Sequence, residues 1–359
     1  MTIVCGIDAH DKELVCRIWR SDRIEETKRA RNTDAGRMEL WGYLAKLRNE
    51  LGGEKVLVAY EACGFGYTIH DEAIDFGYQS YVLATTKMAK SPMDKKRKTD
   101  EYDAQKICEL LRAHELAGLT LPTVWIPSKA LRDDRELVRR RFDVKGDSTR
   151  IKNHIHALLK RHGIKRPEDV DSPWTKSFMK WLKEMELSSG TRFHLNSLLQ
   201  QYESLEKNVK ALDEAVFELS CDKRYVHQVE SMTETKGVGI LSAMVFLTEL
   251  GDLSRFSNRR KMKAYTGLAP SSHESGDVKD RKGHITRSGS SRLRAILNQA
   301  VWARLAHDTA EREWFEEYVA KHAGPRAKSG AVVVCMARLV KLMWHRGLAG
   351  QREYESMIA

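Results

Sequence analysis

Four carboxylates stand at positions from which acidic side chains carry out chemistry. Asp8 ends a short apolar run near the N-terminus, and Glu61 ends a second one. Asp100 and Asp103 lie three residues apart where a helical pattern begins, so they share one helix face. Four carboxylates in one place repel one another unless cations hold them, and hard oxygen ligands suit magnesium. Two magnesium ions about 3.5–4 Å apart activate a nucleophile and stabilise the leaving oxygen in phosphodiester chemistry.

Each carboxylate taken alone also has a simpler explanation. Asp8 suits a turn, and Asp100 with Asp103 suits the capped first turn of a helix. The combination favours a metal site, because an Asp and a Glu at strand ends precede an Asp-x-x-Asp pair on a helix. We therefore predict that Asp8, Glu61, Asp100 and Asp103 bind Mg²⁺ and are catalytic.

The elements that would position these side chains alternate in type. Strand patterns lie at 3–7, 14–19, 24–29, 56–60 and 79–84, and helical patterns lie at 34–52, 67–76 and 99–116. The order β-β-β-α-β-α-β-α predicts a mixed sheet with helices on its faces. It is also the order of the ribonuclease H-like fold.

The middle of the chain is helical, without strand patterns. Between Leu195 and Leu219, apolar residues keep a period of seven over four repeats. An antiparallel helical hairpin and a dimerising coiled coil both remain open, and the strict period favours a coiled coil. Because the composition changes again near residue 229, we predict three segments, 1–128, 129–228 and 229–359. The fold class is α/β plus α, with a mostly helical C-terminal segment.

Two features of the C-terminal segment suit phosphate. The turn Lys236-Gly237-Val238-Gly239 precedes an apolar helix and resembles a helix-hairpin-helix element, although an ordinary helix connection fits equally well. Residues 270–289 then combine hydroxyl, glycine and basic side chains. Such a loop could hold a serine nucleophile against a phosphate. Taken alone, its residues favour a flexible basic loop that contacts only the DNA backbone.

Positive charge is concentrated in three blocks. Residues 87–98, 131–165 and 255–294 carry net charges of +5, +6 and +8, whereas the whole chain carries +11. The remainder is therefore acidic, and this distribution indicates a polyanionic partner, although any one block also suits a solvated helix face. The predicted nucleic-acid-binding residues are Lys95, Lys96, Arg97, Lys98, Arg139, Arg140, Lys236, Gly237, Gly239, Arg281, Lys282, Arg287 and Arg292.

Composition excludes several other classes of protein. A hydrophobic content of 42% excludes a mostly disordered chain. Six scattered cysteines without a Cys-x-x-Cys pair argue against a zinc site or a disulfide framework, and they favour the cytoplasm. The longest apolar stretch stops at Arg338, so we expect no membrane span, and the N-terminus has no signal-peptide pattern.

Seven short motifs occur in a fixed order: Gly6-Ile7-Asp8, Glu61-Ala62-Cys63-Gly64, Lys98-Thr99-Asp100-Glu101-Tyr102-Asp103-Ala104, Lys236-Gly237-Val238-Gly239, Tyr265-Thr266-Gly267-Leu268-Ala269-Pro270, Glu274-Ser275-Gly276 and Gly283-His284-Ile285-Thr286-Arg287-Ser288-Gly289. Together they resemble the DEDD transposases of the IS one-ten type of insertion sequence, relatives of pilin-gene invertases. The resemblance covers nearly the whole chain. Cys63, His10 and Asp11 depart from the commonest family pattern, which more often has small or hydroxyl residues there.

The resemblance implies a RuvC-like N-terminal domain with the four carboxylates as Mg²⁺ ligands, a coiled-coil insertion and a transposase domain. It implies that Ser275 attacks a DNA phosphate and forms a phosphoserine link, with the neighbouring Ser272 as the other candidate. The implied partners are the element ends and target DNA, a structured noncoding guide RNA, and further copies of the chain, as dimers joined into a tetramer.

The resulting hypothesis is an RNA-guided transposase and site-specific recombinase. Three alternatives remain: a metal-dependent nuclease or junction resolvase in which Ser275 only binds phosphate, an invertase without a guide RNA, and a nucleic-acid-binding protein without catalysis.

Overall fold

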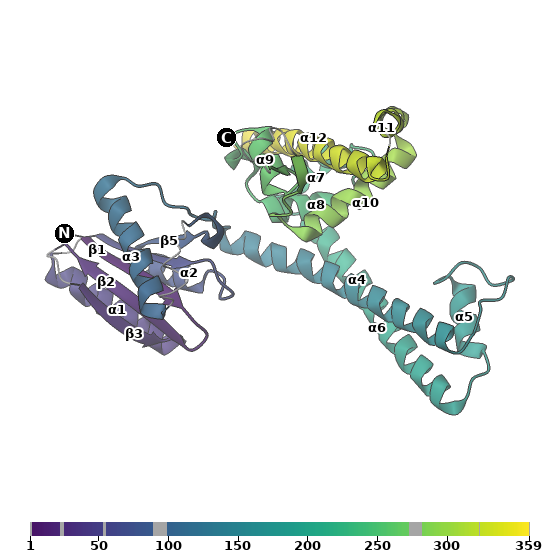
Figure 1. Ribbon diagram of the computed structural model, residues 1–359, viewed down its shortest axis with the longest axis horizontal. Helices are drawn as coiled ribbons and strands as arrows, with labels where there is room; N and C mark the ends of the chain where they lie inside the picture. The colour runs from purple at the N-terminus through teal and green to yellow at the C-terminus, as the bar shows by residue number, and fades with distance from the viewer. Residues whose placement is uncertain are drawn as a thin grey trace. The chain divides into compact units, whose positions relative to one another are not determined.

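The chain forms two compact units that meet in the sequence between Ile126 and Pro127. The computed structural model describes residues 2–21, 25–52, 55–88, 99–272, 282–322 and 324–358. The first unit is mixed α/β, and the second is helical apart from one short hairpin (Figure 1). The predicted segments 129–228 and 229–359 both lie in this second unit.

A five-stranded sheet of order β3-β2-β1-β4-β5 forms the centre of the first unit. Its strands are β1 (Thr2–Ala9), β2 (Glu13–Arg20), β3 (Glu25–Arg31), β4 (Lys55–Glu61) and β5 (Gln79–Leu83). β1, β2 and β3 pair antiparallel, whereas β1–β4 and β4–β5 pair parallel. The structure therefore confirms the predicted mixed sheet.

Helices cover both faces of this sheet. Because side chains alternate along a strand, Cys5 and Ile7 face one side and Val4 faces the other. On the first side, α1 (Asp34–Glu50) and α2 (Thr68–Asp75) enclose the larger core, which includes Trp41. On the second side, α3 (Asp100–Ala117) packs its apolar residues against Val4, Ala59 and Leu83. The sheet thus has a separate core on each face.

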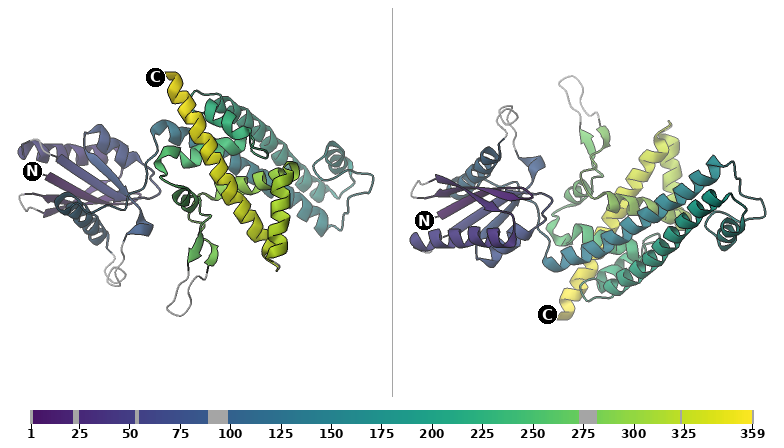
Figure 2. Two further views of the ribbon diagram at one scale, coloured as in Figure 1. Left: turned by 90° about the horizontal axis from the view of Figure 1, so that it is seen from above. Right: turned by 90° about the horizontal axis from the view of Figure 1, so that it is seen from below.

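The second unit begins with two long antiparallel helices, α4 (Lys129–Arg161) and α6 (Ser189–Ser220), with α5 (Lys176–Glu184) at the tip of the pair. The two long helices lie side by side in both views of Figure 2. The heptad residues Leu195, Tyr202, Val209 and Val216 are buried within the chain. Of the two alternatives that the heptad left open, the structure forms the helical hairpin.

Further helices complete the second unit around a continuous core that includes most of α8. They are α7 (Val226–Thr233), α8 (Ile240–Leu250), α9 (Arg259–Tyr265), α10 (Ser291–His307), α11 (Thr309–Lys321) and α12 (Ala327–Ile358). A hairpin of β6 (Pro270–Ser272) and β7 (Lys282–Ile285) follows α9. Among the described residues, none of the helices combines the length and the apolar character needed to cross a membrane.

Candidate active site

The sheet register brings Asp8 and Glu61 together at one end of two parallel strands. Ile7 lies opposite Tyr60, so Asp8 and Glu61 occupy the next position along β1 and β4. Both follow residues that face the larger core, and side chains alternate, so both lie on the other face of the sheet. That face is the one covered by α3. The first two carboxylates therefore lie where the helix bearing the other two packs.

The N-terminal turn of α3 supplies Asp100 and Asp103. Thr99 caps the helix, because its hydroxyl accepts a hydrogen bond from the backbone N–H of Tyr102 at 3.3 Å. The residues of α3 that pack on the sheet are Ala104, Ile107, Cys108 and Leu111. A helix repeats every 3.6 residues, so Asp100 and Asp103 continue this same stripe toward the N-terminus. The packing of α3 therefore directs both carboxylates toward the sheet.

Gly6 sets the distance between α3 and β1. A Cβ atom added at Gly6 would lie 2.4 Å from the backbone nitrogen of Cys108 and 2.5 Å from the carbonyl oxygen of Ala104. Only a hydrogen atom fits there, so glycine allows the helix backbone to contact the strand directly. Gly6 lies two residues before Asp8 on the same face. This contact therefore determines how closely α3 approaches the end of β1.

His10 lies between two of the carboxylates. Its Nε2 atom is 3.0 Å from Asp8 Oδ2 and 3.4 Å from Asp100 Oδ1. The ligand atoms of these three residues all lie within 4.8 Å of one another, a spacing that a single cation could bridge. In the sequence, His10 stands out only as a departure from the commonest family pattern. Its position two residues after Asp8 was the signal that it belongs to the site.

The pKa shifts show that this cluster stabilises positive charge. The pKa of Asp8 is raised above its usual value. Burial and the nearby carboxylates of Asp103 and Asp100 raise it, and together they outweigh the His10 imidazole, which lowers it. Burial acts to lower the pKa of His10, but the Asp8 and Asp100 carboxylates outweigh it and raise that pKa above its usual value. The effect of Asp103 on Asp8 indicates that the second acid of α3 also faces the end of β1.

The predicted serine nucleophile belongs to the connection between β6 and β7. In that hairpin Ser272 pairs with Lys282, and Ser275 lies between them in the sequence. Ser275 is outside the described residues. The predicted nucleic-acid-binding residues Lys95, Lys96, Arg97, Lys98 and Arg281 are outside them as well. Ser271 is described, and its hydroxyl donates a hydrogen bond to the carbonyl oxygen of His284 at 2.9 Å. Ser271 is therefore engaged in holding the hairpin together.

Two of the predicted nucleic-acid-binding arginines form ion pairs inside the second unit. Arg139 contacts both carboxylate oxygens of Glu249, at 2.8 and 3.1 Å, and Arg292 contacts Asp143 at 2.7 Å. These pairs tie α4 to α8 and to α10. Their charges are neutralised within the protein, a role that the composition of the basic blocks did not reveal.

The remaining described basic residues of the prediction differ from these two. Arg140, Lys236 and Arg287 are exposed. Arg287 has a φ of 55°, unusual for a residue other than glycine, and its N–H donates to the carbonyl oxygen of Gly267 at 3.1 Å. This backbone conformation fixes where the exposed side chain leaves the chain after β7.

The glycines of the turn between α7 and α8 have separate roles. A Cβ atom at Gly237 would lie 2.6 Å from both the carbonyl oxygen of Ala300 and the backbone nitrogen of Arg304, and its φ is 85°. Close packing against α10 and the positive φ are therefore sufficient reason for glycine at Gly237, whereas its predicted contact with a phosphate stays a prediction. Gly239 faces open space just before α8 and remains the residue of this turn suited to an anion.

The first unit is an α/β domain with a candidate cation site. The site consists of carboxylates at the ends of adjacent parallel strands and on the helix turn that faces them. The family model of DEDD transposases of the IS110 type matches residues 5–164, which include all four carboxylates. A second model, described as the transposase IS116/IS110/IS902 family, matches residues 229–319. The chain belongs to the IS110/IS116 family of DEDD transposases.

Curated relatives agree with this assignment. The transposase for insertion sequence element IS1533 of Leptospira borgpetersenii is 24% identical over 345 residues, covering 96% of this chain and 95% of that protein. The transposase for insertion sequence element IS1111A of Coxiella burnetii is 24% identical, over 70% of this chain and 66% of that protein. Protein y4qE of Sinorhizobium fredii is 28% identical over 69% of this chain, which spans 58% of its length.

Proposed function

We propose that this protein is the transposase of an insertion sequence, and that it cuts and exchanges DNA strands under the direction of a structured noncoding RNA. The observation that carries the proposal is the convergence of Asp8, Asp100 and Asp103 beside Glu61 in a chain matched by a DEDD transposase model. In this proposal the first unit is a ribonuclease H-like domain of the RuvC type, in agreement with its strand order.

The donor set fits a divalent cation such as Mg²⁺. Asp8 and Glu61 are held by paired strands, and Asp100 and Asp103 by a capped helix, so their oxygens are placed before any ligand binds. The chemistry that a divalent cation would supply there is neutralisation of charge on the phosphate and activation of the attacking oxygen. The contribution of the chain is to hold the four carboxylates within reach of one DNA phosphate.

Ser275 is the proposed nucleophile, by its match to the family motif. Its hydroxyl oxygen would bond to the DNA phosphorus while the bond from phosphorus to the deoxyribose oxygen breaks. The serine proton is lost to a base, and the released sugar oxygen gains a proton. In the sequence, Ser275 lies between β6 and β7, which pair with each other. The guide RNA and the tetramer rest on the family resemblance alone.

A first experiment tests guidance. The gene is expressed with its native flanking DNA, the protein is purified, and the bound RNA is sequenced. A discrete RNA transcribed from the flank is expected. If only heterogeneous RNA is recovered, the protein is better described as an invertase without a guide.

A second experiment tests the chemistry with three variants on labelled DNA. Asp8→Asn should abolish cleavage, and Ser275→Ala should abolish the covalent DNA adduct while DNA binding persists. Ser271→Ala is the matched control, because its hydroxyl is bonded within the hairpin, and it should still form the adduct. Cleavage by Ser275→Ala that leaves free ends would instead identify a nuclease that depends on metal alone.

A further inference from the structure

His10 is the residue of the carboxylate cluster to which the proposed function gives no role. It lies in the turn between β1 and β2, and its imidazole is half exposed. Its Nε2 atom is within 3.4 Å of an oxygen of both Asp8 and Asp100. An imidazole nitrogen in its neutral form is a good ligand for divalent transition metals. The cluster therefore offers a nitrogen donor as well as oxygen donors.

The backbone of His10 is held in place from two sides. Its N–H donates to the carbonyl oxygen of Glu13 at 2.9 Å, and its carbonyl oxygen accepts a hydrogen bond from the Asn32 side chain at 2.8 Å. The Asn32 amide oxygen in turn accepts from Arg37 at 3.0 Å. Arg37 is itself buried and bonded to Glu72. These contacts hold the backbone of His10 in the turn, so its ring reaches the two carboxylates from a fixed point of the chain.

We propose that His10 would be a ligand of a cation bound by Asp8 and Asp100, and that its nitrogen makes the site bind Mn²⁺ in preference to Mg²⁺. Mg²⁺ takes oxygen donors and loses its water reluctantly, so a nitrogen donor in the set disfavours it. Mn²⁺ shares the preference of Mg²⁺ for carboxylate oxygens, but as a first-row transition metal it also accepts an imidazole nitrogen, which suits a mixed donor set of this kind. The inference rests on the proposed function, because it assigns a metal preference to the same site. If His10 is instead only an ion-pair partner of the two carboxylates, it competes with the metal, and removing its ring strengthens metal binding rather than weakening it.

The test measures metal binding directly on the full chain. Free Mn²⁺ gives an electron paramagnetic resonance signal that is lost on binding, and Mg²⁺ affinity follows from competition against Mn²⁺. His10→Ala should weaken Mn²⁺ binding by at least about tenfold and Mg²⁺ binding much less. His154→Ala is the matched control, because His154 is exposed on α4 in the other unit and should change neither affinity. Unchanged or tighter Mn²⁺ binding by His10→Ala would overturn the proposal.

A spectroscopic measurement on the unmodified protein removes any dependence on the folding of the variant. Electron spin-echo modulation of bound Mn²⁺ should show coupling to an imidazole ¹⁴N nucleus, and this coupling should be absent from His10→Ala. Bound Mn²⁺ without nitrogen coupling would also overturn the inference.

Asp8→Ala separates this inference from the proposed function. If Asp8→Ala loses Mn²⁺ binding and His10→Ala does not, the carboxylate site stands and the role of His10 fails. If neither substitution affects metal binding, the carboxylate site itself fails.

Discussion

At the scale of single residues, the geometry of the site depends on the lack of a side chain at Gly6. Gly6 has no side chain, so the backbone of α3 contacts β1 directly. On α3 that contact involves Ala104, the residue that follows Asp103, and on β1 it lies two residues from Asp8. The geometry of the carboxylates is therefore determined partly by a residue that performs no chemistry.

Gly6→Ala tests this point. The new Cβ would meet backbone atoms that cannot rotate away, so we expect α3 to shift, the free energy of unfolding to fall by about 1–3 kcal/mol, and Mn²⁺ affinity to fall. Thermal unfolding and metal titration measure the two effects. Gly42→Ala is the control, because that position on α1 has open space and alanine favours a helix. Equal behaviour of the two variants would contradict the role given to Gly6.

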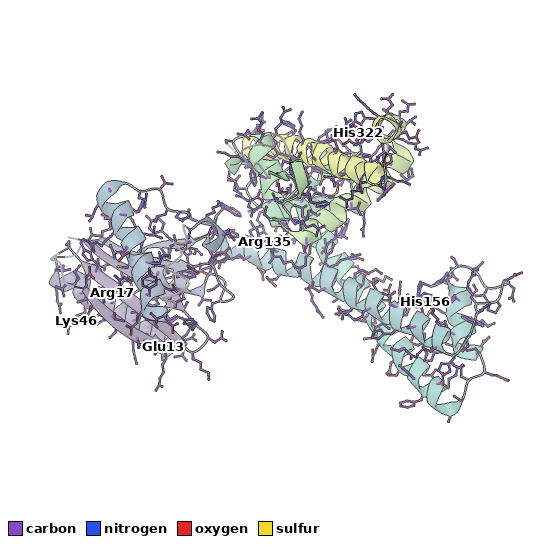
Figure 3. All side chains as sticks on the ribbon, in the orientation of Figure 1. Glu13, Arg17, Lys46, Arg135, His156 and His322 are labelled. Carbon is purple, nitrogen blue, oxygen red and sulfur yellow. The ribbon has the colours of Figure 1, made fainter. Side chains whose placement is uncertain are left out.

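At the scale of elements, α4 joins the helical hairpin to α8 in the core of the second unit. Its apolar side packs along α6, while Arg135, labelled in Figure 3, donates to the carbonyl oxygen of Thr248 at 2.8 Å. One turn further on, Arg139 pairs with the buried carboxylate of Glu249. The hairpin and the helical core that follows are therefore joined by hydrogen bonds as well as by apolar contact.

The Arg139–Glu249 pair should make stability depend on acid. Burial acts to raise the pKa of Glu249, but Arg139 outweighs it and holds the pKa below its usual 4.5. The folded pKa is depressed, so the stabilisation is present above pH 4.5 and is lost as the pH falls through the folded pKa. Denaturant unfolding as a function of pH should show a smaller acid dependence for Glu249→Gln. The same change at exposed Glu214 should leave that dependence intact.

The heptad of α6 gives a second prediction at this scale. Leu195 is fully buried in the hairpin, whereas Leu205 is only half-buried. Leu195→Ala should lower the free energy of unfolding by about 2–5 kcal/mol, and Leu205→Ala should lower it by clearly less. Denaturant unfolding at low protein concentration compares the two. A larger loss for Leu205→Ala would indicate that the second row of the heptad is buried against another copy of the chain.

At the scale of the whole molecule, the distribution of positive charge along the chain bears on the binding of nucleic acid. The net charge of +11 is concentrated in blocks, but the described part of these blocks also contains arginines that are paired internally. The exposed Arg287 and Lys236 are therefore better candidates for phosphate contacts than Arg139 and Arg292.

Salt dependence measures these contacts. Each phosphate contact removed should reduce the slope of log affinity against log salt by about one. We expect this change for Arg287→Ala in filter-binding or fluorescence titrations with DNA. Lys210→Ala, on the exposed side of α6 and outside the basic blocks, should leave the slope unchanged. A flat salt response of the unmodified protein would exclude a partner held mainly through phosphates.

The five strands of the mixed sheet and the helices around it follow from the sequence alone, because apolar periodicity and capping residues are local signals. The short hairpin of β6 and β7 does not, since it lies in a stretch that the sequence predicted to be a loop. The sequence also singled out Asp8, Glu61, Asp100 and Asp103, since their positions relative to strand and helix ends can be counted along the chain. The tertiary structure decided three matters: the place of His10 between two carboxylates, the internal pairing of Arg139, and the helix contact of Gly237. Each of these depends on which residue lies nearby in space. The sequence shows that a side chain is charged or that a residue is glycine, but it does not show which residue will contact it.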